Sequence, residues 1–215
     1  MTDADGTAIA KLNTMAAMQD EHNQQVHPEW RTQGYAYYRA VWVECAEMLD
    51  HFGWKWWKAQ APDLEQVKLE LVDIWHFALS ELLRSDTLRE DMGVQLNELT
   101  PASGSAASGD AEAFRQAIEK LAADSLVSQS FSLPPFIEAM QTLPMTYDEL
   151  FDLYIGKNVL NRFRQDHGYK SGEYRKLWQG REDNEHLMEI LNGLSVPPEV
   201  FADTLYQSLA ERYEA

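Results

Sequence analysis

Two apolar stretches decide the fold of this chain: Tyr35–His51, which reads YAYYRAVWVECAEMLDH, and Leu64–Ser85, which reads LEQVKLELVDIWHFALSELLRS. In both, apolar side chains recur every three or four residues, the spacing of one face of an α-helix. These side chains are Tyr38, Val41, Trp42, Cys45, Met48 and Leu49 in the first stretch, and Val67, Leu71, Ile74, Trp75, Ala78 and Leu82 in the second. Gly53 and the turn at 61–63 separate the stretches, so we predict two helices joined by a short connector.

The rest of the chain also shows helical spacing and no alternating strand pattern. Helices are predicted at about 9–22, 88–99, 111–126, 146–166, 183–194 and 198–213. Pro134, Pro135 and Pro144 punctuate the stretch before 146, to which no helix is assigned. The chain has no glycine-rich nucleotide loop and no solenoid repeat. We therefore predict an all-α helical bundle.

Composition limits the classes of function. With 215 residues, 45% of them hydrophobic, the chain can bury the core of a single domain. A formal charge of −17 argues against binding a nucleic-acid polymer, but not against a small phosphorylated ligand whose pocket holds a metal and a few basic residues. One cysteine, Cys45, rules out an intramolecular disulfide and fits a reducing compartment. We read no signal peptide or membrane-spanning run, and we predict a cytoplasmic protein with no membrane partner.

Two acidic motifs lie within the apolar stretches. Glu44 and Glu47 are three residues apart in the first, and Glu70 and Asp73 in the second. On a helix this spacing puts both carboxylates on one face, so two packed helices would aim four carboxylates at one point. Repulsion and desolvation make such a group unfavourable unless a hard cation neutralises it, and Mg²⁺ suits an all-oxygen site. The pattern indicates metal-assisted phosphate chemistry.

The alternative for each motif is a solvated acidic face, but carboxylates flanked by so many apolar residues are rarely left without a partner. His76 follows Asp73 by three residues and admits several interpretations. As a metal ligand it would indicate a di-iron bundle, which needs a second acidic-x-x-His pair that the first motif lacks. Otherwise it hydrogen-bonds a ligand or fills the core.

Two other segments carry polar chemistry. The segment 54–58 (WKWWK) is either a hydrophobic corner covered by lysines or a ring platform for a planar base. The segment 157–170 is locally basic and rich in amides in an otherwise acidic chain. It is either a solvated face or a group of donors for phosphate oxygens, and we favour the second. We predict a single domain over residues 1–215. Within it, a segment of small residues at about 101–109 is predicted to be a flexible linker between a metal-binding half and a phosphate-binding half.

Together these residues resemble the dimeric all-α dUTP diphosphatases, a branch of the all-α nucleotide pyrophosphatases that include MazG-type enzymes. The paired acidic motifs mark the superfamily. Three further segments resemble the dUTPase branch, namely 18–23, 53–58 and a long run from 156 to 184 with Tyr169, Tyr174, Trp178 and 180–184. The resemblance spans most of the chain except about 86–145.

The resemblance implies hydrolysis of dUTP, and of dUDP as well, to dUMP, with pyrophosphate released from dUTP. It implies that Glu44, Glu47, Glu70 and Asp73 hold two or more Mg²⁺ ions, with Mn²⁺ as a substitute, and that Glu44 orients or deprotonates the attacking water. It further implies a homodimer, for which exposed aromatics such as Tyr35, Tyr37, Trp30 and Trp54 would supply the surface.

The resemblance also assigns substrate contacts. Gln19 and Asn23 would read the uracil edge, Trp56 or Trp57 would pack on the base, and His76 would lie near the sugar. Candidates for the phosphate tail are Lys58, Lys157, Asn161, Arg164, Lys170 and Arg181. Rival interpretations are a related pyrophosphatase for another base, such as that of dCTP, a non-enzymatic helical interaction protein, and the di-iron bundle.

Overall fold

The computed structural model describes residues 2–100, 110–143, 145–196 and 198–214, which form nine α-helices in two compact units, Met1–Phe151 and Asp152–Ala215. The first unit contains α1 (Asp3–Val26), a 3₁₀ turn (Trp30–Thr32), α2 (Tyr37–Phe52), α3 (Leu64–Arg84), α4 (Asp91–Leu99), α5 (Ala111–Ser128), α6 (Leu133–Thr142) and the start of α7 (Tyr147–Asp166). The all-α prediction is therefore confirmed.

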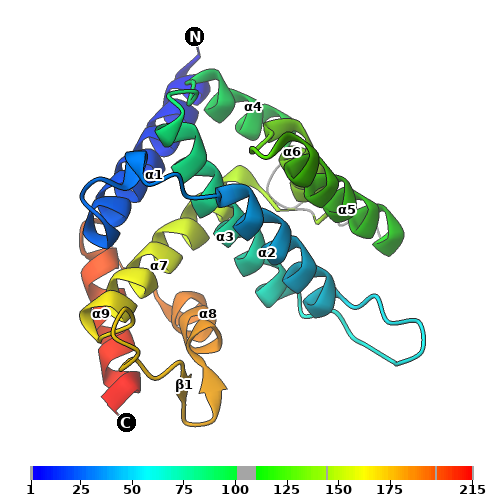
Figure 1. Cartoon of the computed structure of the whole chain (residues 1–215). Helices are drawn as coiled ribbons and strands as arrows, with labels where there is room; N and C mark the ends of the chain where they lie inside the picture. The colour runs from blue at the N-terminus through cyan, green and yellow to red at the C-terminus, as the bar shows by residue number, and fades with distance from the viewer. Residues whose placement is uncertain (1, 101–109, 144, 197, 215) are drawn as a thin grey trace. The chain divides into compact units, whose positions relative to one another are not determined.

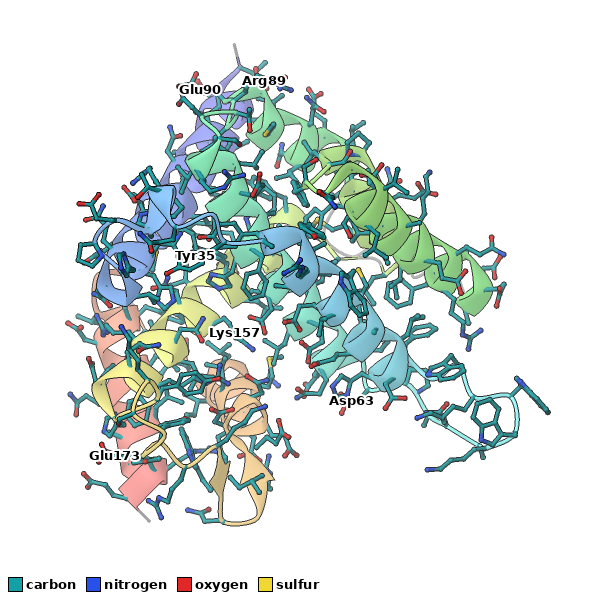
Figure 2. The ribbon with its side chains drawn as sticks, viewed as in Figure 1. Tyr35, Asp63, Arg89, Glu90, Lys157 and Glu173 are labelled. Carbon is teal, nitrogen blue, oxygen red and sulfur yellow. The ribbon has the colours of Figure 1, made fainter. Side chains whose placement is uncertain are left out.

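Helix α3 is the centre of the first unit, and it packs against α1 and α2 (Figure 1). Its residues Val67, Leu71, Ile74 and Trp75 are fully buried, as the apolar spacing predicts. Asp63 caps the start of α3 by accepting a hydrogen bond from the backbone N–H of Gln66 at 3.2 Å (Figure 2). The cap satisfies a backbone N–H of the first turn and marks where α3 begins.

Helix α6 differs from the prediction, which places no helix in a stretch punctuated by Pro134 and Pro135. They stand in the first turn of the helix, where the absence of a proline N–H costs nothing. Phe136 and Met140 of α6 are fully buried, and Phe136 stacks on Trp75 of α3 with ring centroids 5.2 Å apart. Burial of this apolar face stabilises a helix that the local sequence only weakly indicates.

The second unit holds the rest of α7, a short antiparallel pair of strands, β1 (Leu177–Trp178) and β2 (Arg181–Glu182), and the helices α8 (Asp183–Gly193) and α9 (Pro198–Glu214). Its core is aromatic. The ring of Phe163 on α7 lies among those of Trp178, Tyr206 and Tyr213, at centroid distances of 5.2–5.8 Å. These contacts hold α9 and the strand pair around the end of α7.

The unit boundary lies within α7, whereas the predicted linker at 101–109 lies outside the described residues. A single domain over residues 1–215 therefore stays a prediction. Among the described residues, no helix combines the length and apolar character that a membrane crossing requires.

Candidate functional site

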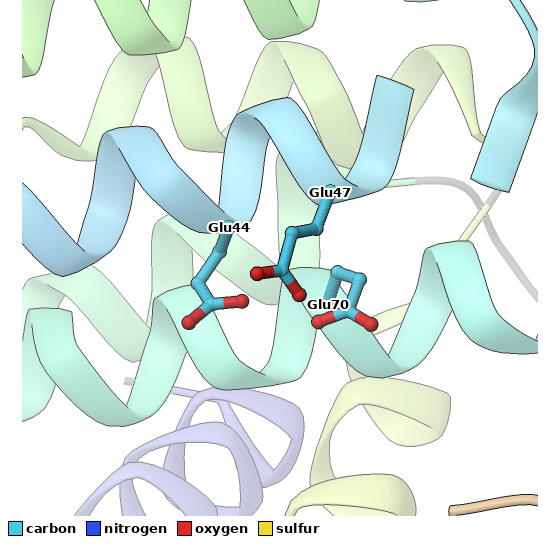
Figure 3. A group of neighbouring side chains, drawn as sticks. All are labelled: Glu44, Glu47 and Glu70. Carbon is cyan, nitrogen blue, oxygen red and sulfur yellow. The ribbon is translucent and has the colours of Figure 1, made fainter. Parts of the chain in front are cut away.

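Three of the four predicted carboxylates meet between α2 and α3. Glu44 and Glu47 project from α2 toward Glu70 of α3 (Figure 3). One carboxylate oxygen from each of the three lies within 4.8 Å of the others. Glu70 is buried, Glu44 half-buried and Glu47 exposed, so the group opens to solvent on one side.

The pKa of Glu44 shows how strongly the neighbouring carboxylates act on one another. Burial, and then the negative charges of Asp73, Glu70 and Glu47 in that order, raise the pKa of Glu44 to about 9. Asp73 is therefore the carboxylate whose charge acts most strongly on Glu44, although it is not one of the three with oxygens within 4.8 Å. Without a cation, the group must hold a proton at neutral pH to relieve its own repulsion.

His51, at the end of α2, is a neighbour of this group that the sequence analysis missed. Its Nε2 lies 3.5 Å from Oε1 of Glu70. A one-turn spacing from Glu47 (positions 47 and 51) is the signal that could have indicated it.

A second polar group lies between α1 and α3. Gln19 and Asn23 of α1 face His76 and Ser80 of α3, and all four side chains are buried. Nδ1 of His76 lies 2.7 Å from Oε1 of Gln19. Gln19, Asn23 and His76 are among the residues predicted from the sequence, whereas Ser80 is not.

The hydroxyl of Ser80 is the centre of this group. It accepts hydrogen bonds from Nε2 of Gln19 at 3.0 Å and Nδ2 of Asn23 at 2.9 Å, and it donates to the carbonyl of His76 at 3.0 Å. Tyr37, at the start of α2, also hydrogen-bonds Ser80, and burial raises the pKa of its phenol to about 12. The phenol is therefore neutral at physiological pH.

The tryptophans of the connector after α2 lie apart from the polar group of Gln19, Asn23, His76 and Ser80, here called the amide group. Residues 53–63 extend as a loop from the end of α2, away from α1 (Figure 1). Trp56 is 90% exposed and Trp57 58% exposed, and their rings pack edge to face with centroids 5.4 Å apart. Within one chain the structure therefore does not bring Trp56 or Trp57 to Gln19 and Asn23. Trp30 contrasts with them, because it is 1% exposed and donates to Asp20, so the expectation that it lies on the surface was wrong.

In the second unit, the predicted phosphate contacts Lys157 and Arg164 lie two turns apart on α7 and meet the first turn of α8. Lys157, labelled in Figure 2, is 1% exposed and donates to Oδ1 of Asn184 at 2.9 Å. Nε and Nη2 of Arg164 each donate to one carboxylate oxygen of Asp183 at 2.8 Å. The dipeptide 183–184 thus binds both cationic side chains.

Asp183 is fully buried and has a second partner. The phenol of Tyr174 donates to its Oδ2 at 2.8 Å. Burial by itself would raise the pKa of Asp183, but the hydrogen bonds and charge of Arg164 and the bond from Tyr174 outweigh burial, so the pKa lies below its usual range. Asp183 is therefore ionised and paired at physiological pH.

The remaining predicted phosphate contacts have varied surroundings. Oδ1 of Asn161 accepts from Nη1 of Arg164 at 3.1 Å. Arg181 forms ion pairs with Glu185 at 3.6 Å and Glu189 at 3.1 Å. Lys58 and Lys170 are exposed.

Comparison with models of known protein families identifies the family to which the chain belongs. The family model described as dUTPase matches residues 11–169, about three quarters of the chain. The chain belongs to the dUTPase family. No curated protein matches it. Membership makes it a nucleotide hydrolase of the dUTP diphosphatase type, and the family implies a divalent metal cofactor.

The matched residues of the chain include both acidic motifs, Gln19, Asn23 and Lys157, together with Asn161 and Arg164. The match ends at 169, so Asp183 and Asn184 lie beyond it. The acidic and amide partners that Lys157 and Arg164 find on α8 thus lie beyond the matched residues.

Proposed function

We propose that this dUTPase hydrolyses dUTP to dUMP and pyrophosphate, and also accepts dUDP, with Mg²⁺ held by Glu44, Glu47, Glu70 and Asp73. The carboxylate group between α2 and α3 carries the proposal. The donors are all oxygen, which suits Mg²⁺ or Mn²⁺ better than softer metals. The raised pKa of Glu44 also supports a cation here, because two or more divalent charges would remove the repulsion that raises it.

When bound, Mg²⁺ supplies charge neutralisation for the phosphate oxygens and lowers the pKa of coordinated water. The residues themselves orient the reactants. Glu44 is half-buried beside two other carboxylates, and we assign it to orient or deprotonate the attacking water. The buried Glu70 keeps its position through packing on α3.

We assign the base to the amide group between α1 and α3, with Asn23 and Gln19 as the readers and His76 near the sugar. Amides can pair with the uracil edge, and a tight wall excludes the methyl group of thymine. Trp56 or Trp57 is proposed to stack on a base. Since their loop extends away from α1, such stacking calls for a movement of the loop or a second subunit.

The phosphate tail is assigned to Lys58, Lys157, Asn161, Arg164, Lys170 and Arg181. In this role, Lys157, Arg164 and Arg181 would exchange part of their present hydrogen bonds for phosphate oxygens. Phosphoryl chemistry requires chiefly positioning and charge neutralisation, which these residues can supply.

We also propose that the enzyme is a cytoplasmic homodimer. The exposed rings of Tyr35, Trp54, Trp56 and Trp57 support this, because such side chains are common where a partner covers them.

The test is pyrophosphate release from dUTP, dCTP, dTTP and UTP, with Mg²⁺ and with EDTA. We expect Mg²⁺-dependent turnover of dUTP, its loss in Glu70→Gln, and normal turnover in Glu65→Gln, which changes an exposed carboxylate on the same helix. Turnover of dCTP at the same rate would overturn the uracil assignment, and no turnover of any nucleotide would overturn the enzymatic proposal.

A further inference from the structure

The tryptophan loop, residues 53–63, is tied down where it leaves α2. The peptide between Gly53 and Trp54 has one carbonyl and one N–H, and side chains bind both. Nε and Nη2 of Arg115, on α5, donate to the carbonyl of Gly53 at 3.0 and 2.7 Å. From the other side, Oε1 of Gln60 accepts from the N–H of Trp54 at 3.2 Å. The side chains of Arg115 and Gln60 together are called the brace below.

The brace acts at the residue where the chain has most freedom. Gly53 ends α2 with φ of +90°, and a glycine by itself sets no single direction for the peptide that follows. Because a peptide is planar, holding its carbonyl and its N–H fixes that direction. The guanidinium of Arg115 is a charged donor, so its bonds are stronger than those of a neutral group. Gln60 also accepts from the N–H of Lys55 at 2.8 Å, which holds the next peptide as well.

Arg115 is itself kept in place by packing. Its guanidinium lies over the ring of Phe52, 5.4 Å from the ring centroid. Phe52 is 8% exposed and packs against Phe114 of α5, which is 1% exposed, with centroids 4.4 Å apart. The brace therefore rests on a buried contact between α2 and α5.

Further contacts lead from the braced peptide to the exposed rings. Nε1 of Trp54 donates to Oδ1 of Asp50, in the last turn of α2, at 3.3 Å. The ring of Trp54 packs edge to face on that of Trp57 with centroids 5.3 Å apart, and Trp57 packs in the same way on Trp56 at 5.4 Å. The direction in which the loop leaves α2 therefore sets where the three rings lie.

From this geometry we infer that Arg115 and Gln60 are positioning residues for the tryptophan rings, because they hold the direction in which the loop leaves α2. The inference rests on the proposed function, in which Trp56 or Trp57 stacks on a base. It assigns the placement of these rings to a residue of α5, 62 positions along the chain from Gly53. Since a braced loop does not turn toward α1 (Figure 1), the brace favours the second subunit over a movement of the loop as the route to stacking.

The first measurement needs no substrate. Amide hydrogen exchange, followed by NMR, is compared in the wild type, Arg115→Met and Gln60→Leu. Methionine keeps an apolar stem over Phe52 but donates no hydrogen bond, and leucine lacks the accepting oxygen of glutamine. We expect the N–H groups of Trp54 and Lys55 to exchange about tenfold faster in both variants, while the amides of α3 keep their rates. Unchanged exchange at Trp54 in both variants would show that there is no brace and would overturn the inference.

The second measurement is kcat/KM for dUTP with Mg²⁺ in the same variants. We expect each variant to lower kcat/KM by about tenfold, which lies within the range of one lost stacking contact. The same substitutions are then made in a Trp56→Ala/Trp57→Ala background. There Arg115→Met should have no further effect, because a positioning residue acts only through the groups that it positions. A residue with a merely structural role would lower kcat/KM in both backgrounds.

Glu112→Ala is the matched control. Glu112 pairs with Nη1 of Arg115 at 3.3 Å, and its side chain is 63% exposed. Its loss leaves both bonds to Gly53 in place, so the exchange rates and kcat/KM should remain those of the wild type. If Arg115→Met does not fold by circular dichroism, Gln60→Leu carries the test, because it releases the same peptide from the other side.

The outcomes separate the two proposals. If the wild type hydrolyses dUTP, the inference is overturned by an unchanged or higher kcat/KM in Arg115→Met and Gln60→Leu, or by an equal loss with and without the rings. The proposed function would then still stand. If the wild type turns over no dUTP, the proposed function fails and the inference fails with it, whereas the exchange rates still show whether the brace holds the loop.

Discussion

Replacing Asp183 by alanine should strongly destabilise the second unit. The change leaves the guanidinium of Arg164, whose side chain is 12% exposed, without two 2.8 Å bonds, and it removes the acceptor of Tyr174. Breaking a buried ion pair on one side costs about 3–5 kcal/mol. For a chain of this length that corresponds to a fall in Tm of about 10 °C, at roughly 2–4 °C per kcal/mol.

The assay is thermal and urea denaturation followed by circular dichroism, with Glu189→Ala as the matched control. Glu189 lies on the same helix and also pairs with arginines, but it is exposed, so its loss should barely move the midpoint. The double variant Arg164→Met/Asp183→Leu should recover part of the loss, because no buried charge remains uncompensated. Equal midpoints for Asp183→Ala and Glu189→Ala would refute the reasoning.

The sign of the pH dependence supplies a second check on Asp183. Its pKa lies below the ordinary value of 3.8, so the unfolded chain binds a proton at a higher pH than the folded one. The stabilisation is therefore fully present above that value and is lost as the pH falls through the folded pKa. The difference in free energy of unfolding between the wild type and Asp183→Asn should therefore become smaller as the pH falls below about 4.

Three further predictions concern the first unit. Because burial and neighbouring carboxylates raise the pKa of Glu44 from 4.5 to about 9, the metal-free fold should lose stability as the pH rises between these values, and Glu44→Gln in EDTA should abolish that slope in urea titrations. Gly93→Ala should destabilise the protein by about 1–3 kcal/mol, since a Cβ would lie 2.9 Å from the carbonyl oxygen of Ala8, whereas Gly6→Ala, with open space around it, should stabilise α1 by about 1 kcal/mol. Trp56→Ala should leave Tm unchanged because the ring is 90% exposed, and a large fall would mean that the ring is covered in solution.

Most of the helices and the acidic group could be predicted from the sequence, because their signals are local. Apolar spacing fixes the buried face of α3, and a three-residue spacing puts each pair of carboxylates on one side of its helix. Once α2 and α3 pack along their apolar stripes, Glu44, Glu47 and Glu70 must meet.

Tertiary structure decided the rest. Helix α6 is stabilised by burial of Phe136 against Trp75, a contact across 61 positions, and its two prolines stand in the first turn, where a helix tolerates them. Trp30 is buried in the fold, and its indole N–H is satisfied by Asp20, ten positions earlier on α1.

The same holds for hydrogen-bond partners. Spacing indicates that Gln19 and Asn23 share a face of α1, but only the packing of α1 on α3 places Ser80 against both amides. Likewise, the sequence predicts that the basic segment 157–170 supplies hydrogen-bond donors for a ligand. In the fold, Arg164 of this segment pairs with Asp183, nineteen positions away. Local sequence determines which way a helical side chain points, whereas the partner that compensates its buried charge is set by long-range packing, because desolvation depends on everything that surrounds the group.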